Sequence, residues 1–597
     1  MNKRNILVFL AVSVTLILCF LLVFWFLSRT ESDGNFEYTW SDELEGYYVS
    51  ADKASYGEEL VIPAEYEGKP VVAIAQKGFA GVKGFKTVVL PASVKKITYA
   101  AFRECPDLEV IDWYGSGVES IGNLAFYECD KLESFNFPAN TKVVSNSMFY
   151  GCDSLREVTL SDGVLTIMER AFSRCTKLAS VTIPKNVVKI SDSAFYNCTA
   201  LGEVEFAKDS ALTKIGRQAF SRCQALSRLT FPEKLTHIGS GAFSYCTGLT
   251  FVSFTADAVG APAEDGGYPN QAYLEEFGAS AFEGCSSLDG VEIADIRNWC
   301  EIDFLGDDYA NPIYVGQKIY HDGELVLRLD IPKGVTHIKD RAFKNATRIV
   351  SVTLPSTMYY DDSNELGVAP IGKEAFLYCY KLVEIYNFSK LGLPQDPSSF
   401  GAYGYIAAYL KDSIKTYDYW TYPENGIFPY GEIGKVYDKK TAFSTDRDGK
   451  RIYASNIYIE DDFLFYKHTN GLYLLGYLGD SQKIFLPELT ESYTVFTAAF
   501  FGQRNVKCVV IPDSVKAIEH FTFYSCYDLE HVYIPSSVKS FGDRLFGKCT
   551  NLVIDVEASE HNVGWNPDWA DLDENEKITV NYDQSDKTLE WINDMRI

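Results

Sequence analysis

The sequence lacks the residue patterns that mark common catalytic and metal sites. Histidine occurs only 7 times in 597 residues, and neither H-E-x-x-H nor G-x-S-x-G is present. The close cysteine spacing of zinc sites, C-x₂₋₄-C, is also absent, which disfavours a bound metal. We therefore predict no catalytic, metal or cofactor-binding residue, and a protein that is not an enzyme.

Positive charge is scarce as well. The chain has 55 lysines and arginines against 81 acidic residues, a formal net charge of −26, and no local basic patch. This excess of negative charge repels phosphate backbones, so nucleic acid is not an expected partner. With 47% hydrophobic and 14% aromatic residues, the chain has enough apolar surface for a large folded core, and we do not expect disorder through most of it.

Long apolar runs are absent except at the N-terminus. Residues Ile6 to Leu27 form an uncharged run that would span ~33 Å as a helix, which matches a bilayer core of ~30 Å. The bulky residues Trp25 and Phe26 stand where a cleaved signal peptide has small ones, so we expect the helix to be retained. The sequence predicts a transmembrane anchor over residues 6–28.

The charges beside this anchor indicate its orientation. Lys3 and Arg4 precede it, whereas Arg29 on its other side is followed by Glu31 and Asp33. Because positively charged flanks stay in the cytoplasm, residues 1–5 are predicted to be a cytoplasmic tail. We expect a single-pass protein of the cell membrane, with the rest of the chain outside the cytoplasm.

Phenylalanine, usually preceded by alanine, recurs at a spacing near 23 residues. This period is typical of an array of stacked coils. One coil cannot bury its own apolar residues, so its neighbours must cover them. The recurring positions are Phe79, Phe102, Phe126, Phe149, Phe172, Phe195, Phe220, Phe243, Phe282, Phe343, Phe376, Phe500, Phe523 and Phe546.

Two periodicities lie inside each unit, as residues 155–178 illustrate. Val158 and Leu160 alternate with polar residues, the pattern of a strand with one buried face. Proline ends several of these strands, because it cannot donate to the ladder. A second set of apolar residues has spacings of four, four and three, which predicts a short helical turn: Ile167, Ala171, Cys175 and Leu178.

Most of the cysteines occupy one position of the unit, three residues after the phenylalanine. Other units have Val82, Ala346 or Gln503 there, so we interpret the position as a small, partly buried packing site with unpaired thiols. Adjacent coils are expected to lie ~4.8 Å apart, a distance that also permits disulfide bonds between the cysteines of neighbouring coils. That alternative stays open. Eleven of the 14 cysteines belong to this set: Cys105, Cys129, Cys152, Cys175, Cys198, Cys223, Cys246, Cys285, Cys379, Cys526 and Cys549.

The repeat L-x-x-V-x-I-P-x-x-V-x-x-I-x-x-x-A-F-x-x-C resembles that of the BspA-type leucine-rich-repeat surface proteins. The resemblance covers roughly residues 60–385 and 486–555. The asparagine of ordinary leucine-rich repeats is replaced by residues such as Val187 and Leu235. We therefore do not assume that this solenoid has the curvature of ordinary leucine-rich repeats. The resemblance implies surface display with adhesion or protein recognition, and it identifies no ligand.

Segments without the motif interrupt the array, at roughly 256–277, 294–330, 356–371 and 386–485. The last segment is rich in aromatic residues and contains a predicted β-hairpin, Phe463–Tyr466 facing Leu472–Leu475. We therefore expect a juxtamembrane segment and N-terminal cap at 29–59, a solenoid with insertions at 60–385 and an inserted aromatic-rich module at 386–485. The solenoid then resumes at 486–555, and a C-terminal cap follows at 556–597.

Three partial motifs have simpler explanations. Gly367, Gly372 and Lys373 have the spacing of a phosphate loop, but Glu374 replaces the hydroxyl residue that would hold magnesium, and the motif coincides with the repeat. Residues 446–449 resemble part of a calcium loop without its first and last acids, which indicates a polar turn. His237 and His337 occupy equivalent repeat positions, so the scaffold explains their recurrence.

The outward positions of the strands are mainly polar and are the predicted recognition face: Glu157, Thr159, Ser180, Thr182, Arg228, Thr230, Ser351 and Thr353. Exposed aromatic residues of the 386–485 module are further contact candidates.

The predicted fold class is an α/β repeat solenoid of parallel coils, each a short strand plus a short helical turn, with an N-terminal transmembrane helix and an inserted aromatic-rich β module. The expected function is recognition of a protein or glycan outside the cell, or adhesion to it. No ligand-binding residue or oligomeric state follows from the sequence. Two alternatives stay open: a non-catalytic scaffold of the cell envelope, and an enzyme whose site lies within 386–485.

Overall fold

The computed structural model describes the chain from residue 30 to residue 596, with gaps. The described residues are 30–113, 115, 117–254, 274–358, 370–389, 435–437, 443–445, 451–453, 455–559, 565, 569–570, 578–585 and 589–596. The chain divides into two compact units. Unit 1 comprises Met1–Leu325 and Lys339–Ala342, and unit 2 comprises Val326–Ile338 and Phe343–Ile597.

The predicted anchor at 6–28 lies outside the described residues, as does most of the aromatic-rich segment, including 390–434. Within the described part of the chain, no helix combines the length and apolar character needed to cross a bilayer.

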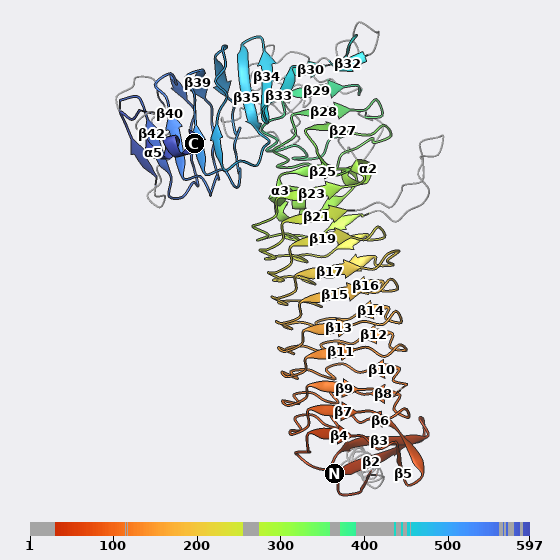
Figure 1. The fold of residues 1–597 in the computed structure, drawn as a ribbon. Coiled ribbons are helices and arrows are strands. Elements are labelled where there is room, and N and C mark those ends of the chain that lie inside the picture. The colour runs from red at the N-terminus through yellow and green to blue at the C-terminus, as the bar shows by residue number, and fades with distance from the viewer. Residues whose placement is uncertain are drawn as a thin grey trace, which may run out of the picture. The chain divides into compact units, whose positions relative to one another are not determined.

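Unit 1 is a stack of coils that form parallel strands (Figure 1). It begins with antiparallel strands β1 (Thr30–Ser32), β2 (Phe36–Ser41) and β3 (Gly46–Ala51), followed by β5 (Glu65–Tyr66) and β6 (Lys69–Ile74), and β3 pairs with β6 in parallel. Buried Tyr38 and Tyr47 pack with Tyr66 at this end of the stack.

Most coils of unit 1 then contribute one strand to each of two rows, which we call the major and minor ladders. The major ladder comprises β4 (Glu59–Val61), β7 (Thr87–Val89), β9 (Val110–Asp112), β11 (Ser134–Asn136), β13 (Glu157–Thr159), β15 (Ser180–Ile183), β17 (Glu203–Phe206), β19 (Arg228–Phe231), β21 (Phe251–Phe254), β23 (Gly290–Ile293) and β25 (Ile319–His321). The minor ladder has two-residue strands: β8 (Lys96–Ile97), β10 (Ser120–Ile121), β12 (Val143–Val144), β14 (Thr166–Ile167), β16 (Lys189–Ile190), β18 (Lys214–Ile215), β20 (His237–Ile238), β22 (Glu276–Phe277) and β24 (Asp303–Phe304).

The prediction of a helical turn in each unit is wrong. Residues 168–178 form consecutive tight turns, and Ile167 belongs to the minor-ladder strand β14. Arg170 and Arg174 have φ values of 54° and 64°, in the left-handed region, where a right-handed helix cannot continue. The apolar residues with spacings of four and three are still buried, because the turns repeat every few residues and keep one side facing the core.

Backbone hydrogen bonds explain why these turns replace a helix. The amides of Ala171, Ser173 and Cys175 donate to carbonyls three residues back, which closes the turns. The alternate amides donate to the next coil, as Phe172 N does to Ala194 O at 2.7 Å. Stacking therefore satisfies backbone groups that an isolated coil would leave unpaired, and the turns depend on their neighbours.

The repeated phenylalanines form a continuous column in the core of unit 1. From Phe79 to Phe282, the ring centroids of successive coils are 5.0–5.6 Å apart, and the rings are nearly parallel. Each of these rings is fully buried. Stacked aromatic pairs add to the free energy gained from burial, so the column stabilises contacts between coils rather than within one coil.

The cysteines that follow these phenylalanines have a specific hydrogen-bond role. In all eleven units, the Sγ atom donates to the carbonyl oxygen of the phenylalanine in the preceding coil, at 2.9–3.3 Å. All thirteen described cysteines are buried free thiols. The position thus selects a small side chain that is apolar enough for the core and still donates to a buried carbonyl.

Burial should make these thiols unreactive in the folded protein. It raises the pKa of the Cys198 and Cys285 thiols to about 12, so very little of the reactive thiolate forms at about pH 8. We expect iodoacetamide to leave the eleven repeat cysteines unlabelled in the native chain and to label all of them in guanidinium, as measured by mass spectrometry of cysteine peptides. Labelling of Cys198 in the native chain as fast as in the unfolded chain would contradict this expectation.

The segment at 294–330 was predicted to be an insertion, but its residues up to 325 continue both ladders. Helix α2 (Ile296–Cys300) leads to minor-ladder strand β24, which pairs with β22. The 3₁₀ helix η1 (Asp308–Ala310) and helix α3 (Pro312–Gly316) then lead to β25, which pairs with β23 and forms a hairpin with β26 (Glu324–Leu325). Trp299 and Ile313 are buried in this coil, and the Trp299 ring contacts Phe254, Phe277 and Phe304.

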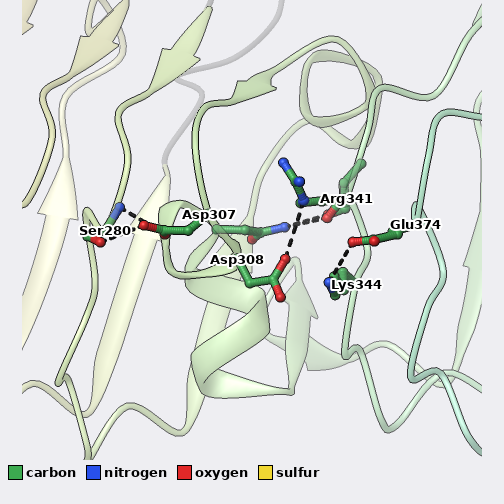
Figure 2. A network of polar contacts seen from close by, with 8 residues as sticks. Ser280, Asp307, Asp308, Arg341, Lys344 and Glu374 are labelled. Atoms are coloured by element: carbon green, nitrogen blue, oxygen red, sulfur yellow. Dashed lines mark hydrogen bonds and ion pairs between the residues drawn. The ribbon is translucent and has the colours of Figure 1, made fainter. Parts of the chain in front are cut away.

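Polar contacts hold this modified coil in unit 1. Asp307 accepts hydrogen bonds from the amide and hydroxyl of Ser280, at 3.0 and 2.6 Å, and Asp308 lies 3.3 Å from the Arg341 guanidinium (Figure 2). The Asn311 side chain donates to the carbonyl oxygens of Arg341 and Ala342. In unit 2, Figure 2 also shows the mostly buried ion pair of Lys344 with Glu374, at 2.6 Å.

Unit 2 contains three main sheets. The first comprises β27 (Arg328–Asp330), β28 (Ser351–Leu354), β29 (Glu384–Asn387) and β30 (Lys435–Tyr437). The second comprises β33 (Ile457–Glu460), β34 (Phe463–His468), β35 (Gly471–Tyr477), β37 (Tyr493–Val495), β39 (Val515–Ile518) and β41 (Ser540–Phe541). The third comprises β36 (Lys483–Phe485), β38 (Cys508–Val510), β40 (His531–Ile534), β42 (Val553–Val556) and β43 (Thr579–Asn581). Two further strands, β31 (Phe443–Thr445) and β32 (Arg451–Tyr453), form a pair, and helix α5 (Glu590–Arg596) follows β43.

The predicted β-hairpin is confirmed. Strands β34 and β35 are antiparallel, with Tyr466 opposite Tyr473. What the sequence did not indicate is that β35 then pairs in parallel with β37, so the hairpin starts a parallel sheet. Strands β2 and β3 start unit 1 in the same way, through an antiparallel pair followed by a parallel partner.

Candidate recognition surface

The outward side of the major ladder in unit 1 is exposed and mainly polar, with exposed valines such as Val61 and Val110 in its first coils. Strands alternate their side chains, so that Val158 and Val181 face the core while the neighbouring residues face solvent. The predicted exposure is confirmed for six of the eight residues of the predicted face: Glu157, Thr159, Ser180, Thr182, Arg228 and Thr230.

The prediction is wrong for the two positions in unit 2. Ser351 is only 2% exposed and Thr353 is half-buried. Ser351 lies beside Glu384 in the register of β28 and β29, and Glu384 accepts hydrogen bonds from the Ser455 hydroxyl and the Asn456 amide. The segment that enters β33 therefore covers this part of the sheet, a long-range contact that the repeat pattern does not reveal.

A depression in the outward face lies over β17 and β19, and it is the candidate site. The spacing from Phe195 to Phe220 is 25 residues instead of 23, which lengthens the connection after β17. Strand β17 pairs with β15, and β19 pairs with β21, but β17 and β19 are not paired with each other, as is also true of β9 and β11 and of β13 and β15. The longer coil coincides with an open depression of about 820 Å³.

The lining of the depression is mixed in charge. Glu203 and Glu205 project from β17, Arg228 and Thr230 from β19, and the loops after the two strands add further charged residues, among them Lys208, Asp209, Glu233 and Lys234. Phe206 and Phe231 contribute apolar surface at the ends of the strands. The sequence analysis missed the two glutamates, although the longer repeat spacing was a signal that could have pointed to this coil.

The charges on the two strands do not neutralise each other. The Arg228 guanidinium lies 4.6 Å from the centre of the Phe251 ring, on the side of β21. Glu205 accepts a long hydrogen bond, 3.5 Å, from the Thr182 hydroxyl, and no ion pair joins Glu203 or Glu205 to another described residue. The carboxylates and the guanidinium are therefore available for a ligand that carries both charges.

The depression offers charged and apolar groups that a ligand could contact. Its lining contains charged, hydroxyl and apolar side chains, and no histidine or cysteine. Across the described residues, no group of three histidine, cysteine, aspartate or glutamate side chains could hold a metal ion. The calcium-like turn at 446–449 and Gly367 lie outside the described residues, whereas Gly372 and Lys373 begin a coil of the repeat.

The two histidines in equivalent repeat positions have the same local role. Nδ1 of His237 lies 2.7 Å from the Thr236 hydroxyl, and Nδ1 of His337 lies 2.9 Å from the Thr336 hydroxyl. Both contacts join neighbours in the chain, as expected when the scaffold, and not a site, determines the position.

Parallel coils of 23 residues, stacked through buried phenylalanines, define a leucine-rich-repeat solenoid. The family profile described as "BspA type Leucine rich repeat region" matches six copies, in residues 58–179, 142–259, 313–390 and 480–562, more than half of the chain. The chain belongs to this family. The comparison with curated proteins finds no match.

Solved structures of other leucine-rich-repeat proteins resemble the chain at low sequence identity. A protein from Bacteroides ovatus ATCC 8483 is 23% identical, with 60% of this chain and 94% of that chain covered and a TM-score of 0.35. A leucine-rich cell surface protein from Faecalibacterium prausnitzii A2-165 is 22% identical, with the same coverage and a TM-score of 0.29. The pneumococcal vaccine antigen PcpA is 17% identical, with 60% and 88% covered and a TM-score of 0.33.

Proposed function

We propose that this protein is a recognition or adhesion protein that binds a protein or glycan ligand through the outward face of its major ladder. The depression over β17 and β19 carries the proposal, because it joins exposed carboxylates, a guanidinium and apolar surface on a rigid scaffold. A preorganised surface loses little conformational freedom on binding, which favours affinity and selectivity. A ligand with complementary charges would bind there without any bond chemistry.

We further propose that the solenoid is displayed outside the cell, attached by the apolar segment at 6–28. The length of that segment and its charged flanks support this arrangement. Protease treatment of intact cells tests it: degradation of the solenoid while residues 1–5 stay protected is the expected result, and a solenoid that is cleaved only after lysis would contradict it.

Charge reversal on β17 is the sharpest test of the recognition surface. The full-length chain in nanodiscs would be screened against panels of matrix proteins, cells and glycans. For a ligand that binds saturably, Glu203→Lys with Glu205→Lys should weaken binding at least about ten-fold, because two favourable contacts become repulsive.

Glu119→Lys with Glu169→Lys makes the same change in charge at exposed positions outside the depression. This control should leave binding unchanged apart from a small general effect of charge. Equal losses for both double variants would show that net charge, and not the depression, governs binding.

A further inference from the structure

The minor ladder of unit 1 presents a basic outward face on an acidic chain, and Figure 1 shows its strands β8 to β16 in succession along the stack. The second residue of each two-residue strand is buried, so the first residue and the one before it face outward. From β8 to β18 these positions form what we call the lysine stripe, roughly 24 Å long at ~4.8 Å per coil. It has one acid, Glu119, and five exposed lysines: Lys95, Lys96, Lys142, Lys189 and Lys214.

Neighbouring acids do not neutralise the lysine stripe. None of its five lysines forms an ion pair with another described residue, whereas Lys131, on a turn of unit 1, pairs with Asp107 at 2.8 Å. Lys189 and Lys214 are directly opposite each other in the register of β16 and β18. Like charges in this position repel each other, so an anion bound beside them would relieve the repulsion.

Stacking, and not any local stretch of the sequence, produces this concentration of charge. Lys142 and Lys189 are 47 residues apart, and Lys189 and Lys214 are 25 residues apart. Further along the minor ladder the outward positions become acidic, with Glu276 in β22 and Asp303 in β24. The positive surface is therefore bounded, and it is not a general property of the repeat.

Aliphatic side chains lie among these lysines. Val143, Leu165 and Val188 are 39%, 45% and 44% exposed. The Leu165 amide donates to the Lys142 carbonyl, and the Val188 amide donates to the Leu165 carbonyl, so these residues lie side by side in successive coils. Positive charge next to exposed aliphatic surface fits a ligand that carries both anionic groups and apolar faces.

The lysine stripe is too narrow to match a flat anionic surface such as a membrane. Only two residues of each coil belong to it, and carboxylates lie beside it. Asp162 precedes β14 and Asp192 follows β16, and neither forms an ion pair with a described cation. A charged membrane would meet these carboxylates as well as the lysines, whereas a single extended polymer can follow the stripe alone.

We propose that the lysine stripe binds an acidic polysaccharide, a chain of sugar rings that carry carboxylates. The carboxylates pair with the lysines, and the C–H faces of the rings cover Leu165 and Val188. An extended acidic peptide fits less well, because side chains on one of its faces are ~6.8 Å apart, out of step with coils ~4.8 Å apart. The stripe lies on the minor ladder, so this inference does not rest on the depression in the major ladder.

The probe is polygalacturonate, which has a carboxylate on every ring, added to the full-length chain in zwitterionic nanodiscs. Saturable binding that weakens as the ionic strength rises is expected, and uncharged dextran should not bind. Lys189→Glu with Lys214→Glu should weaken binding at least about ten-fold, because two attractive contacts become repulsive. The absence of saturable binding to both polygalacturonate and hyaluronate would overturn the proposal.

Two further variants separate the stripe from the overall charge. Lys83→Glu with Lys177→Glu makes the same change in charge at exposed positions outside the stripe, and it should leave binding nearly unchanged. Glu119→Lys removes the one acid of the stripe and should strengthen binding at least about two-fold. Equal losses for the two double lysine variants would show that net charge governs binding, and the site would be wrong.

The class of ligand is tested through the aliphatic residues. Leu165→Ser with Val188→Ser keeps the charge and should weaken polygalacturonate binding at least about three-fold, because the contact with the sugar rings is lost. Polyglutamate, poly(U) RNA and phosphatidylglycerol vesicles should all bind more weakly than polygalacturonate. Tighter binding of any of these three would overturn the assignment to a polysaccharide. Glu203→Lys with Glu205→Lys should not weaken polygalacturonate binding, so failure here is distinguishable from failure of the depression as a site.

Discussion

Phe172→Ala is expected to lower the free energy of unfolding by about 3–5 kcal/mol. The ring is completely buried, and it stacks on Phe149 and Phe195 with centroid distances of 5.3 and 5.1 Å. Its removal leaves a cavity that the rigid backbone of three stacked coils cannot close, because amides of this coil donate to the next one.

Hydrogen exchange of the native protein is the appropriate measurement, because a long solenoid does not have to unfold in a single step. Protection should fall most in the coils that contain Phe149, Phe172 and Phe195, and little near the start of unit 1. Lys177→Ala, an exposed position in the same coil, should change stability by less than about 0.5 kcal/mol. A loss below about 1 kcal/mol for Phe172→Ala would show that the column contributes little.

Glu384→Ala is expected to destabilise unit 2 by about 3–5 kcal/mol. The carboxylate is completely buried and accepts hydrogen bonds from the Tyr386 hydroxyl at 2.9 Å, and from the Ser455 hydroxyl and the Asn456 amide at 2.8 Å each. Alanine would leave the buried Tyr386 hydroxyl and the half-buried Ser455 hydroxyl without their acceptor, and would release the Asn456 amide. The main effect should be the release of β33 and β34 from β28 and β29.

Increased exchange of the amides in residues 455–477, with β38 and β40 less affected, is the expected signature. Glu384→Gln is the matched control, since it keeps the shape and one acceptor oxygen and should cost clearly less than the alanine variant. If glutamine and alanine were equally damaging, the negative charge itself and not the hydrogen-bond geometry would be responsible.

The buried pattern of each coil was readable from the sequence, and its backbone conformation was not. The spacing of Ile167, Ala171 and Cys175 correctly identified residues that face the core, because any compact turn that repeats every few residues places them on one side. An α-helix and a series of tight turns share this property. They differ in where the amides donate, and the amide of Phe172 donates to the next coil, which is a tertiary contact.

The recognition surface was predictable in part. Alternation along the strands correctly placed Ser180 and Thr182 outward, since it is a local property of extended chain. Glu203 and Glu205 gained importance only because they line the depression beside the longer coil, a feature of the three-dimensional surface that repeat spacing describes incompletely. Ser351 was misjudged because the segment that covers it lies about a hundred residues further along the chain.

The sequence by itself determined that this protein is a stack of similar coils, because each coil repeats the same apolar positions and cannot bury them alone. The family follows from the same repeat. Only the tertiary structure decided which outward faces are free and which are covered. The loop near Ser455 and the helix α5 take up two of these faces through long-range contacts, and no periodic pattern records a contact between segments that are far apart in the chain.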